Sequence, residues 1–154
     1  MKPAVYIQLY HHIIFAVKYR QRLLKKEIRP YVFRYISGII TNRGHKSIIV
    51  NGVDDHIHIL IGLNPNDKTS DLVASIKRSS SLYINQQNWF KGKFQWQDGY
   101  GGFSHSRSQI KNVYKYIKNQ ENHHEENNFR KEYVNLLERY RIEYDERYLF
   151  KFFE

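Results

Sequence analysis

The chain has 154 residues, no cysteine and a formal net charge of +10. This length predicts a single domain over residues 1–154 with a substantial core, and the absence of cysteine excludes disulfides and thiolate metal sites. No apolar run is long enough to cross a bilayer, and the first residues carry no secretion signal. We therefore expect a cytoplasmic protein without a membrane partner.

Positive charge is concentrated in the first third of the chain. Residues 1–50 contain 10 Lys and Arg but one acidic residue, and the whole chain contains 13 Tyr, 9 Phe and 2 Trp. Cationic side chains bind phosphates, and aromatic rings stack on the bases of single-stranded nucleic acids. The composition therefore favours a nucleic-acid partner, although half-buried core tyrosines would also explain many of the aromatic residues.

The first half of the chain predicts a strand, a helix and a hairpin. Residues 5–18 are mostly apolar, as in a strand that is partly buried on both faces. Residues 27–40 place apolar side chains at helical spacing, with Pro30 in the first turn, where proline is tolerated. Residues 46–53 and 53–61 are two strands with only a short turn between them, which predicts an antiparallel hairpin.

Two groups of basic residues are candidates for binding DNA phosphates. One group follows the first strand. The other lies on a helix predicted from about residue 69 to residue 87, on a face away from its apolar stripe. A solvated turn and an exposed polar helix face are the alternatives for these positions. The five candidates are Lys18, Arg20, Arg22, Lys77 and Arg78.

The second half has shorter elements. Residues 94–96 are aromatic and predict a short last strand, whereas the glycine-rich residues 99–102 predict a loop whose backbone approaches another group closely. This loop lacks the glycine spacing and the Lys-Ser/Thr pair of a nucleotide-phosphate loop, so we expect no nucleotide cofactor. Ser106 and Gln109 form a candidate capping box that opens a helix over residues 110–120.

The chain is predicted to end with a linker, a helix and a tail. Residues 123–128 are polar and predict a short linker; a second metal site at His123 and His124 is a less favoured alternative. Residues 129–140 predict the final helix, and residues 142–154 form a charged, aromatic tail.

His56 and His58 are the first candidates for chemistry. Because side chains alternate along a strand, the two imidazoles share one face, while Ile57, Ile59 and Ile61 lie on the other. Neutral imidazole is a common metal ligand, and a rigid strand would hold the pair ready for one divalent cation. A His-x-His pair is a weak motif on its own, because a chain with 8 His can contain this spacing by chance.

The helix predicted over residues 110–120 offers a third ligand and a nucleophile. Tyr116 and Gln120 are four residues apart and share one helical face. A tyrosine hydroxyl beside a metal-bound phosphate is a nucleophile, and the carboxamide oxygen of Gln120 can bind the same metal. Tyr83 and Gln87 have the same spacing, so spacing alone does not choose between the two tyrosines.

Several motifs, taken in their order along the chain, resemble the IS200/IS605-type single-tyrosine transposases. These are HUH enzymes, named for His, a hydrophobic residue and His. The resemblance extends from about Tyr6 to Tyr148, and it implies that Tyr116 is the nucleophile, because the family nucleophile lies in the C-terminal helix. The motifs are Lys18-Tyr19-Arg20, Asp55-His56-Ile57-His58-Ile59-Leu60, Trp96-Gln97-Asp98-Gly99-Tyr100-Gly101-Gly102-Phe103-Ser104 and Tyr116-Ile117-Lys118-Asn119-Gln120.

The resemblance also implies a fold and an activity. The fold would be α+β, an antiparallel sheet with helices packed on one face in an RRM/ferredoxin-like arrangement, and the predicted order of elements fits it. His56, His58 and Gln120 would bind Mg²⁺ or Mn²⁺. Tyr116 would cleave single-stranded DNA beside an imperfect hairpin and form a 5′-phosphotyrosine. Family members are homodimers in which the tyrosine helix can serve the partner's histidines.

Two further functions are alternatives to transposition. One is a domesticated relative that acts on chromosomal repeat hairpins with the same chemistry. The other is a catalytically silent RRM-like domain that only binds single-stranded nucleic acid. The presence of His56, His58, Tyr116 and Gln120 favours the catalytic readings, and a cleavage assay would separate them from the silent domain.

Overall fold

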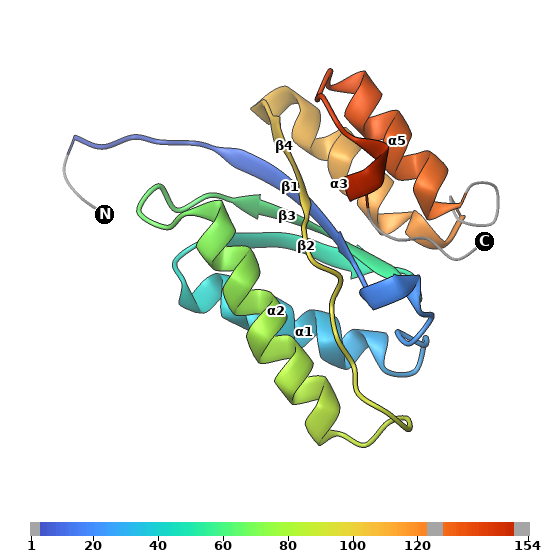
Figure 1. Cartoon of the computed structure of the whole chain (residues 1–154). Helices are drawn as coiled ribbons and strands as arrows, with labels where there is room; N and C mark the ends of the chain where they lie inside the picture. Colours follow the sequence, from blue (N-terminus) through green and yellow to red (C-terminus); the bar gives the residue numbers. More distant parts are fainter. Residues whose placement is uncertain (1–3, 123–127, 150–154) are drawn as a thin grey trace.

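The computed structural model describes residues 4–122 and 128–149, which form a four-stranded antiparallel sheet with helices on both faces. The strands lie in the order β2-β3-β1-β4 (Figure 1). Their bounds are β1 Tyr10–Ala16, β2 Lys46–Gly52, β3 His56–Gly62 and β4 Gly101–His105. The α+β class and the antiparallel sheet predicted from the sequence are therefore confirmed.

The histidine strand lies inside the sheet, between β1 and β2. In its register with β1, His58 is opposite Ile14 and His56 is opposite Ala16. The predicted hairpin between β2 and β3 is also present, with Asn51 opposite His58. A central strand is paired on both sides, so its side chains are held by two ladders of hydrogen bonds.

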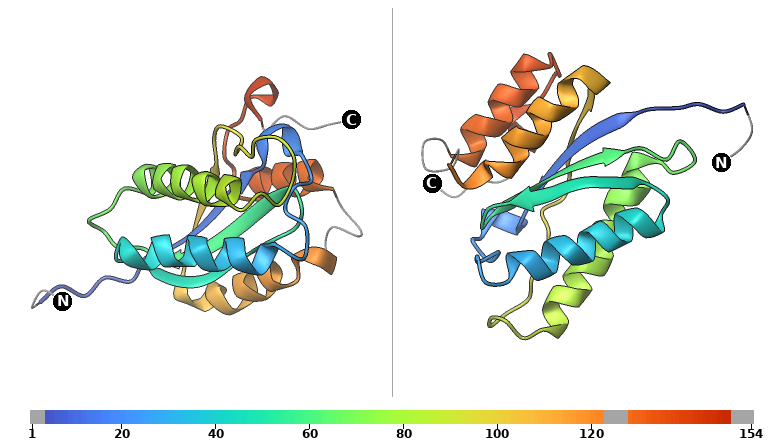
Figure 2. Two further views of the ribbon diagram at one scale, coloured as in Figure 1. Left: turned by 90° about the horizontal axis from the view of Figure 1, so that it is seen from below. Right: turned by 180° about the vertical axis from the view of Figure 1, so that it is seen from behind.

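The helices form two layers, one on each face of the sheet. Figures 1 and 2 show α1 and α2 on one face and α3 and α5 on the other. The prediction of helices on one face thus holds for α1 and α2 alone. Apolar side chains point to both faces of the sheet, so each face needs a covering layer. The helix bounds are α1 Arg29–Asn42, α2 Thr69–Gln86, α3 Ile110–Lys118 and α5 Phe129–Arg139.

The faces differ in chemistry in the way that strand alternation predicts. Ile57, Ile59 and Ile61 are fully buried on the face covered by α1 and α2. His56 and His58 are fully buried on the opposite face, under α3 and α5. The second layer of helices therefore shields the two imidazoles from bulk water.

Two strand predictions differ from the structure. The first strand begins only at Tyr10, and residues 94–96 form no strand apart from one isolated bridge between Val17 and Trp96. The fourth strand instead starts at Gly101, inside the stretch predicted to be a loop. Propensity argues against glycine in a strand, but β1 supplies the hydrogen-bonding partner for this segment.

The close approach predicted for the glycine-rich stretch is present at Gly101. A Cβ at this position would lie 2.7 Å from a ring carbon of Tyr133 and 2.8 Å from its hydroxyl oxygen. Tyr133 belongs to α5 and is buried. The absence of a side chain at Gly101 thus allows α5 to pack directly against β4.

The segment predicted as a linker lies mostly outside the described residues, since these omit 123–127. Asn128 begins the described C-terminal part, and its side-chain oxygen accepts a hydrogen bond of 2.9 Å from the backbone N–H of Lys131. This contact caps α5. The division into one domain with a linker stays a prediction. No helix among the described residues combines the length and apolarity needed to span a membrane.

The packing at Gly101 gives a stability prediction. Gly101→Ala should lower the free energy of unfolding by about 1–3 kcal/mol, because the new methyl group overlaps the buried ring of Tyr133. The matched control is Gly102→Ala on the same strand, where a Cβ would meet nothing within 4 Å. Denaturant unfolding of both variants checks this, and equal stabilities would show that α5 is not seated through Gly101.

Candidate metal and tyrosine site

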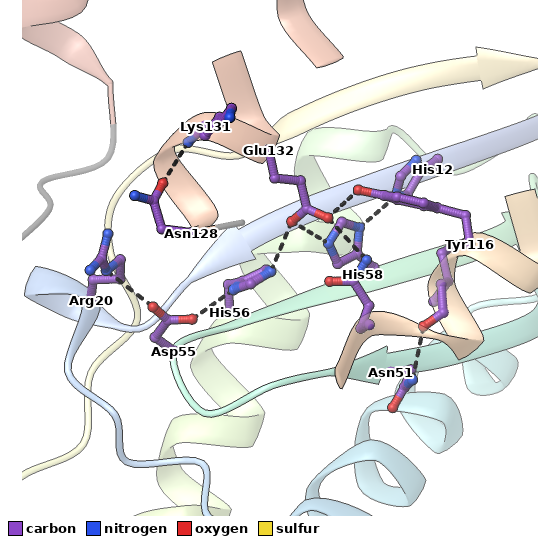
Figure 3. A network of polar contacts seen from close by, with 12 residues as sticks. His12, Arg20, Asn51, Asp55, His56, His58, Tyr116, Asn128, Lys131 and Glu132 are labelled. Carbon is purple, nitrogen blue, oxygen red and sulfur yellow. Dashed lines mark hydrogen bonds and ion pairs between the residues drawn. The ribbon is translucent and has the colours of Figure 1, made fainter. Parts of the chain in front are cut away.

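Two imidazoles and one carboxylate meet under the second layer of helices. The Nε2 atoms of His56 and His58 lie 3.2 and 3.3 Å from the same oxygen, Oε1 of Glu132 (Figure 3). The histidines come from β3 and the glutamate from α5. All three side chains are buried, so the interactions between them are screened little by water.

Each imidazole is oriented through its other ring nitrogen. His56 Nδ1 lies 2.7 Å from Asp55 Oδ1, and the second oxygen of Asp55 pairs with Arg20 Nε at 3.1 Å. His58 Nδ1 lies 2.8 Å from Nε2 of His12 on β1. With both Nδ1 atoms engaged, both Nε2 atoms point at Glu132, as metal-binding imidazoles do when their outer partners fix them.

Tyr116 and Gln120 reach the other oxygen of the same carboxylate. The Tyr116 hydroxyl donates a hydrogen bond to Glu132 Oε2 (Figure 3), and Gln120 Nε2 donates to that oxygen at 3.1 Å. Gln120 is fully buried, and its own Oε1 has no hydrogen-bond partner among the described residues. The structure thus brings together the four residues singled out in the sequence.

The helix that carries Tyr116 is fastened to the sheet near its end. The side-chain amide of Asn51 on β2 donates to the backbone oxygens of Ile117 and Lys118, at 2.8 and 3.2 Å. Carbonyls in the last turn of a helix lack intrahelical partners. Asn51 supplies such a partner, and its hydrogen bonds hold the end of α3, and therefore Tyr116, in position over the histidines.

The residues present fit a divalent cation. One ligand atom each from His56, His58 and Glu132 can be chosen so that all lie within 4.8 Å of one another. A cation with bonds of about 2.1 Å holds neighbouring ligand atoms roughly 3 Å apart. The unpaired Oε1 of Gln120 is a further neutral donor beside this group. Two nitrogen and two oxygen donors suit Mn²⁺ better than Mg²⁺, which prefers oxygen.

Protonation in the site follows from burial and from the Glu132 charge. Burial, the charge of Glu132 and the hydrogen bond to it raise the pKa of Tyr116 well above 10, so its hydroxyl is protonated at neutral pH. Burial alone would lower the pKa of His56, but its hydrogen bonds to Asp55 and Glu132 raise it overall. A proton on His56 therefore helps to compensate the carboxylate, and a cation would have to displace it.

Two other tyrosines, Tyr83 and Tyr114, lie in different surroundings from Tyr116. Tyr83 is on α2, the helix that covers the far side of the sheet from the histidines (Figure 1), and its ring stacks on Tyr35 with centroids 4.2 Å apart. Tyr114 is 37% exposed on α3. Among the described tyrosines, Tyr116 is the one whose hydroxyl reaches Glu132.

The five predicted DNA contacts fall in different surroundings. Arg22 and Arg78 are exposed, and Lys18 is half-buried beside the ring of Tyr19. Arg20 instead pairs with Asp55. Lys77 donates to the backbone oxygens of Gln97 and Gly99 at 2.7 Å each.

Arg20 and Lys77 therefore have structural contacts that the sequence did not reveal. Burial lowers the pKa of Lys77 to about 8, and its ammonium lies over the ring of Phe15, on the face opposite the histidines. DNA binding by all five residues stays a prediction.

Glu132 is the site residue that the sequence analysis missed. It lies on the apolar stripe of the last helix, three residues after the buried Phe129 and next to the buried Tyr133. An acidic side chain inside such a stripe is rarely buried without a partner. This signal was present in the sequence, but nothing in the pattern said which partner Glu132 would meet.

Comparison with known proteins places the chain in a family. The sequence model described as "Transposase IS200 like" matches residues 5–120. The chain belongs to this IS200-like transposase family. It is 26% identical over 118 residues to the ISDra2 transposase TnpA of Deinococcus radiodurans, which covers 73% of this chain and 84% of that protein.

Solved structures share the fold of this IS200-like transposase. A protein of Deinococcus radiodurans R1, described as a transposase, superimposes with a TM-score of 0.59 at 24% identity, over 78% of this chain and 96% of the other. A REP-associated tyrosine transposase bound to a REP hairpin gives a TM-score of 0.60 at 15% identity, over 80% and 73%. Both likenesses bear out the α+β architecture.

The family match ends at Gln120. It includes both histidines, Tyr116 and Gln120, and it leaves out α5 and therefore Glu132. The carboxylate that joins the site of this IS200-like transposase thus comes from a part of the chain beyond the matched region.

The outer partners of the imidazoles give a prediction for metal binding. Asp55→Asn should weaken Mn²⁺ binding by about 10- to 100-fold, because Asp55 fixes the orientation and basicity of His56. Asp54→Asn is the matched control, since the hydrogen bond and ion pair to His56 come from Asp55. Calorimetric titration with Mn²⁺ measures the effect. Equal affinities for the two variants would contradict this role of Asp55.

Proposed function

We propose that this chain is a metal-dependent single-strand DNA transposase that cleaves and rejoins strands through a 5′-phosphotyrosine on Tyr116, at hairpin-bearing element ends. One observation carries the proposal: the Tyr116 hydroxyl and the Nε2 atoms of His56 and His58 meet at the two oxygens of one carboxylate, Glu132. A phosphate held at the histidines would therefore lie within reach of the phenol.

Metal binding and nucleophilic attack belong to different residues. His56, His58 and Glu132, with Gln120 beside them, would hold Mn²⁺ or Mg²⁺, which when bound supplies a Lewis acid for the scissile phosphate. Tyr116 attacks the phosphorus, and a bond forms between its phenolic oxygen and phosphorus. The bond from phosphorus to the 3′ oxygen of the preceding nucleotide breaks, and this oxygen takes up a proton and leaves as a 3′-OH.

Rejoining is the same exchange in reverse. A 3′-OH attacks the phosphotyrosine, the new phosphodiester forms and the Tyr116 hydroxyl is restored. One ester is exchanged for another at each step, so no nucleotide needs to be hydrolysed.

Tyr116 must lose its proton as it attacks. Its raised pKa means that the hydroxyl is not ionised in the resting site. Glu132 Oε2 already accepts the hydrogen bond from that hydroxyl and is the acceptor at hand. Bringing positive charge to the carboxylate would weaken the repulsion that Glu132 exerts on a phenolate.

The substrate and assembly are part of the proposal. A structural relative is bound to a REP hairpin, which supports single-stranded DNA with an imperfect hairpin as the partner here. The resemblance to the family also supports a homodimer. Within one chain Tyr116 already reaches its own histidines, so in this arrangement the partner need not supply the tyrosine.

A domesticated role is the second candidate. It is suggested by the likeness to a REP-associated transposase, whose TM-score of 0.60 is matched by the 0.59 of the other transposase, so fold similarity does not separate the two roles. The chemistry would be identical, and the DNA flanking the gene would decide: a mobile element lies between hairpin-bearing ends, whereas a domesticated gene does not.

Covalent trapping tests the nucleophile. Wild-type chain incubated with Mn²⁺ and hairpin-bearing single-stranded DNA should form a protein–DNA adduct that EDTA prevents. Tyr116→Phe should abolish the adduct, because the attacking oxygen is gone. Tyr114→Phe on the same helix should leave it intact. Denaturing gels and mass spectrometry of the linked peptide measure this. An adduct on Tyr116→Phe, or none on wild type, would overturn the proposal.

Metal titration tests the ligands. Glu132→Gln should weaken Mn²⁺ binding at least about tenfold, because a charged ligand becomes neutral. Glu138→Gln, on the same helix and exposed, is the matched control. Gln120→Ala should also weaken binding if its free carboxamide oxygen is a ligand. Unchanged affinity in Glu132→Gln would mean that this carboxylate only caps the imidazoles in the metal-free state.

A further inference from the structure

A small pocket adjoins Tyr116 on the side away from His56. It has a volume of about 240 Å³, and residues on or next to β1, β4, α3 and α5 line it. Its walls include the rings of His12, His105, Tyr116 and Tyr140, with Asn112 at the rim. The mechanism proposed above does not use this pocket.

His105 is the feature that indicates a ligand. It is 8% exposed on β4 and lines the pocket, and its ring nitrogens have no hydrogen bond of good geometry among the described residues, although the side chain of Gln109 in the same wall lies close enough to interact with the ring. A buried polar group without a partner is costly. Its position in the pocket wall means that something entering the pocket would satisfy it.

We propose that this pocket receives one nucleobase of the single-stranded DNA substrate, from a nucleotide that flanks the scissile phosphate. This inference rests on the proposed function, because it takes DNA at Tyr116 as given. It adds a contact that would select the base at that position.

The pocket lies close enough to the reacting groups for such a nucleotide. Tyr116 forms part of its wall, and His12, another wall residue, stacks on His58 with ring centroids 5.0 Å apart. His12 is thus shared between the pocket and the metal site (Figure 3). A nucleotide whose phosphate lies at Tyr116 could place its base one side chain away.

The walls suit a whole nucleotide: the guanidinium of Arg139 also lines the pocket and would pair with a phosphate, while the remaining polar groups are neutral and suit a base. Burial lowers the pKa of His105, and Arg139 lowers it further against an opposing contribution from Gln109, so the ring is neutral at pH 7. A neutral imidazole offers one donor and one acceptor, and the carboxamide of Asn112 offers both kinds. A base edge carries donors and acceptors, whereas a phosphate only accepts.

Size and shape agree with a base as the part that enters the pocket. The volume of about 240 Å³ is below the range of roughly 300–1,000 Å³ that is usual for whole ligands, so it suits one planar ring system. The ring of Tyr140 lies at the wall, 5.5 Å from that of His105 and nearly perpendicular to it. A base in this pocket would have an aromatic ring to stack on and polar wall groups for its edge.

Nucleotide titration tests the pocket without catalysis. The metal-free wild-type chain, with labelled histidine and backbone nitrogens, is titrated with each of the four deoxynucleoside 5′-monophosphates, and with 2-deoxyribose 5-phosphate as the base-free control. At least one nucleotide should shift the His105 ring signals and saturate in the millimolar range, while the sugar phosphate should not. Asn112→Ala should weaken that binding, and His105→Ala should weaken it about tenfold or more.

Controls keep this test separate from that of the proposed function. Because His105 is buried and its substitution can unfold the chain, Asn112→Ala, an exposed site, provides an independent variant, and Asn135→Ala on the exposed side of α5 is its control. Equal shifts with the sugar phosphate, or no saturable shift with any nucleotide, would overturn the pocket assignment. If the nucleotide titration fails but Tyr116 still forms the covalent adduct with DNA, the pocket assignment is wrong and the proposed transposase activity is unaffected.

Discussion

The buried carboxylate of Glu132 is the interaction on which the rest of the site depends. A negative charge removed from water needs compensation, and here donors from β3, from α3 and from Gln120 provide it. The docking of α5, the direction of the two imidazoles and the position of the phenol are therefore coupled through one group. A cation bound there would meet the same need for positive charge, so protons and metal compete for one position.

Much of this site follows from periodicity, and the remainder depends on tertiary contacts. Strand alternation was enough to put His56 and His58 on one face. Helical spacing predicted the proximity of Tyr116 and Gln120, although α3 ends at Lys118 and Gln120 lies just beyond its end. Glu132 could not be assigned to the site from the sequence, because its histidine partners lie more than 70 positions away along the chain. The basic residues were assigned by charge alone, which cannot distinguish a phosphate contact from Arg20 paired with Asp55. The fourth strand was misplaced because β1 overrides the poor strand propensity of Gly101 and Gly102.

The boundary of the family match separates two contributions to the site. The matched residues 5–120 supply the sheet, both histidines and the tyrosine helix, and this architecture persists in structures that are only 15–24% identical. The last helix then closes the site from outside that region. In this chain the shared fold is thus completed by a helix that lies beyond the matched residues.

The attachment of α3 through Asn51 would bear on an exchange of this helix between subunits if the proposed homodimer forms. Leaving its own sheet would cost α3 the bonds from Asn51 and the contact between Tyr116 and Glu132. In a symmetric pair the neighbouring subunit carries the same amide and the same carboxylate, so every lost bond has an identical replacement across the two-fold axis. Whether α3 packs on its own sheet or on that of the other subunit would then depend on the segments that connect α3 to the rest of the chain. Small sequence changes in these segments could change the preferred arrangement without altering the catalytic groups.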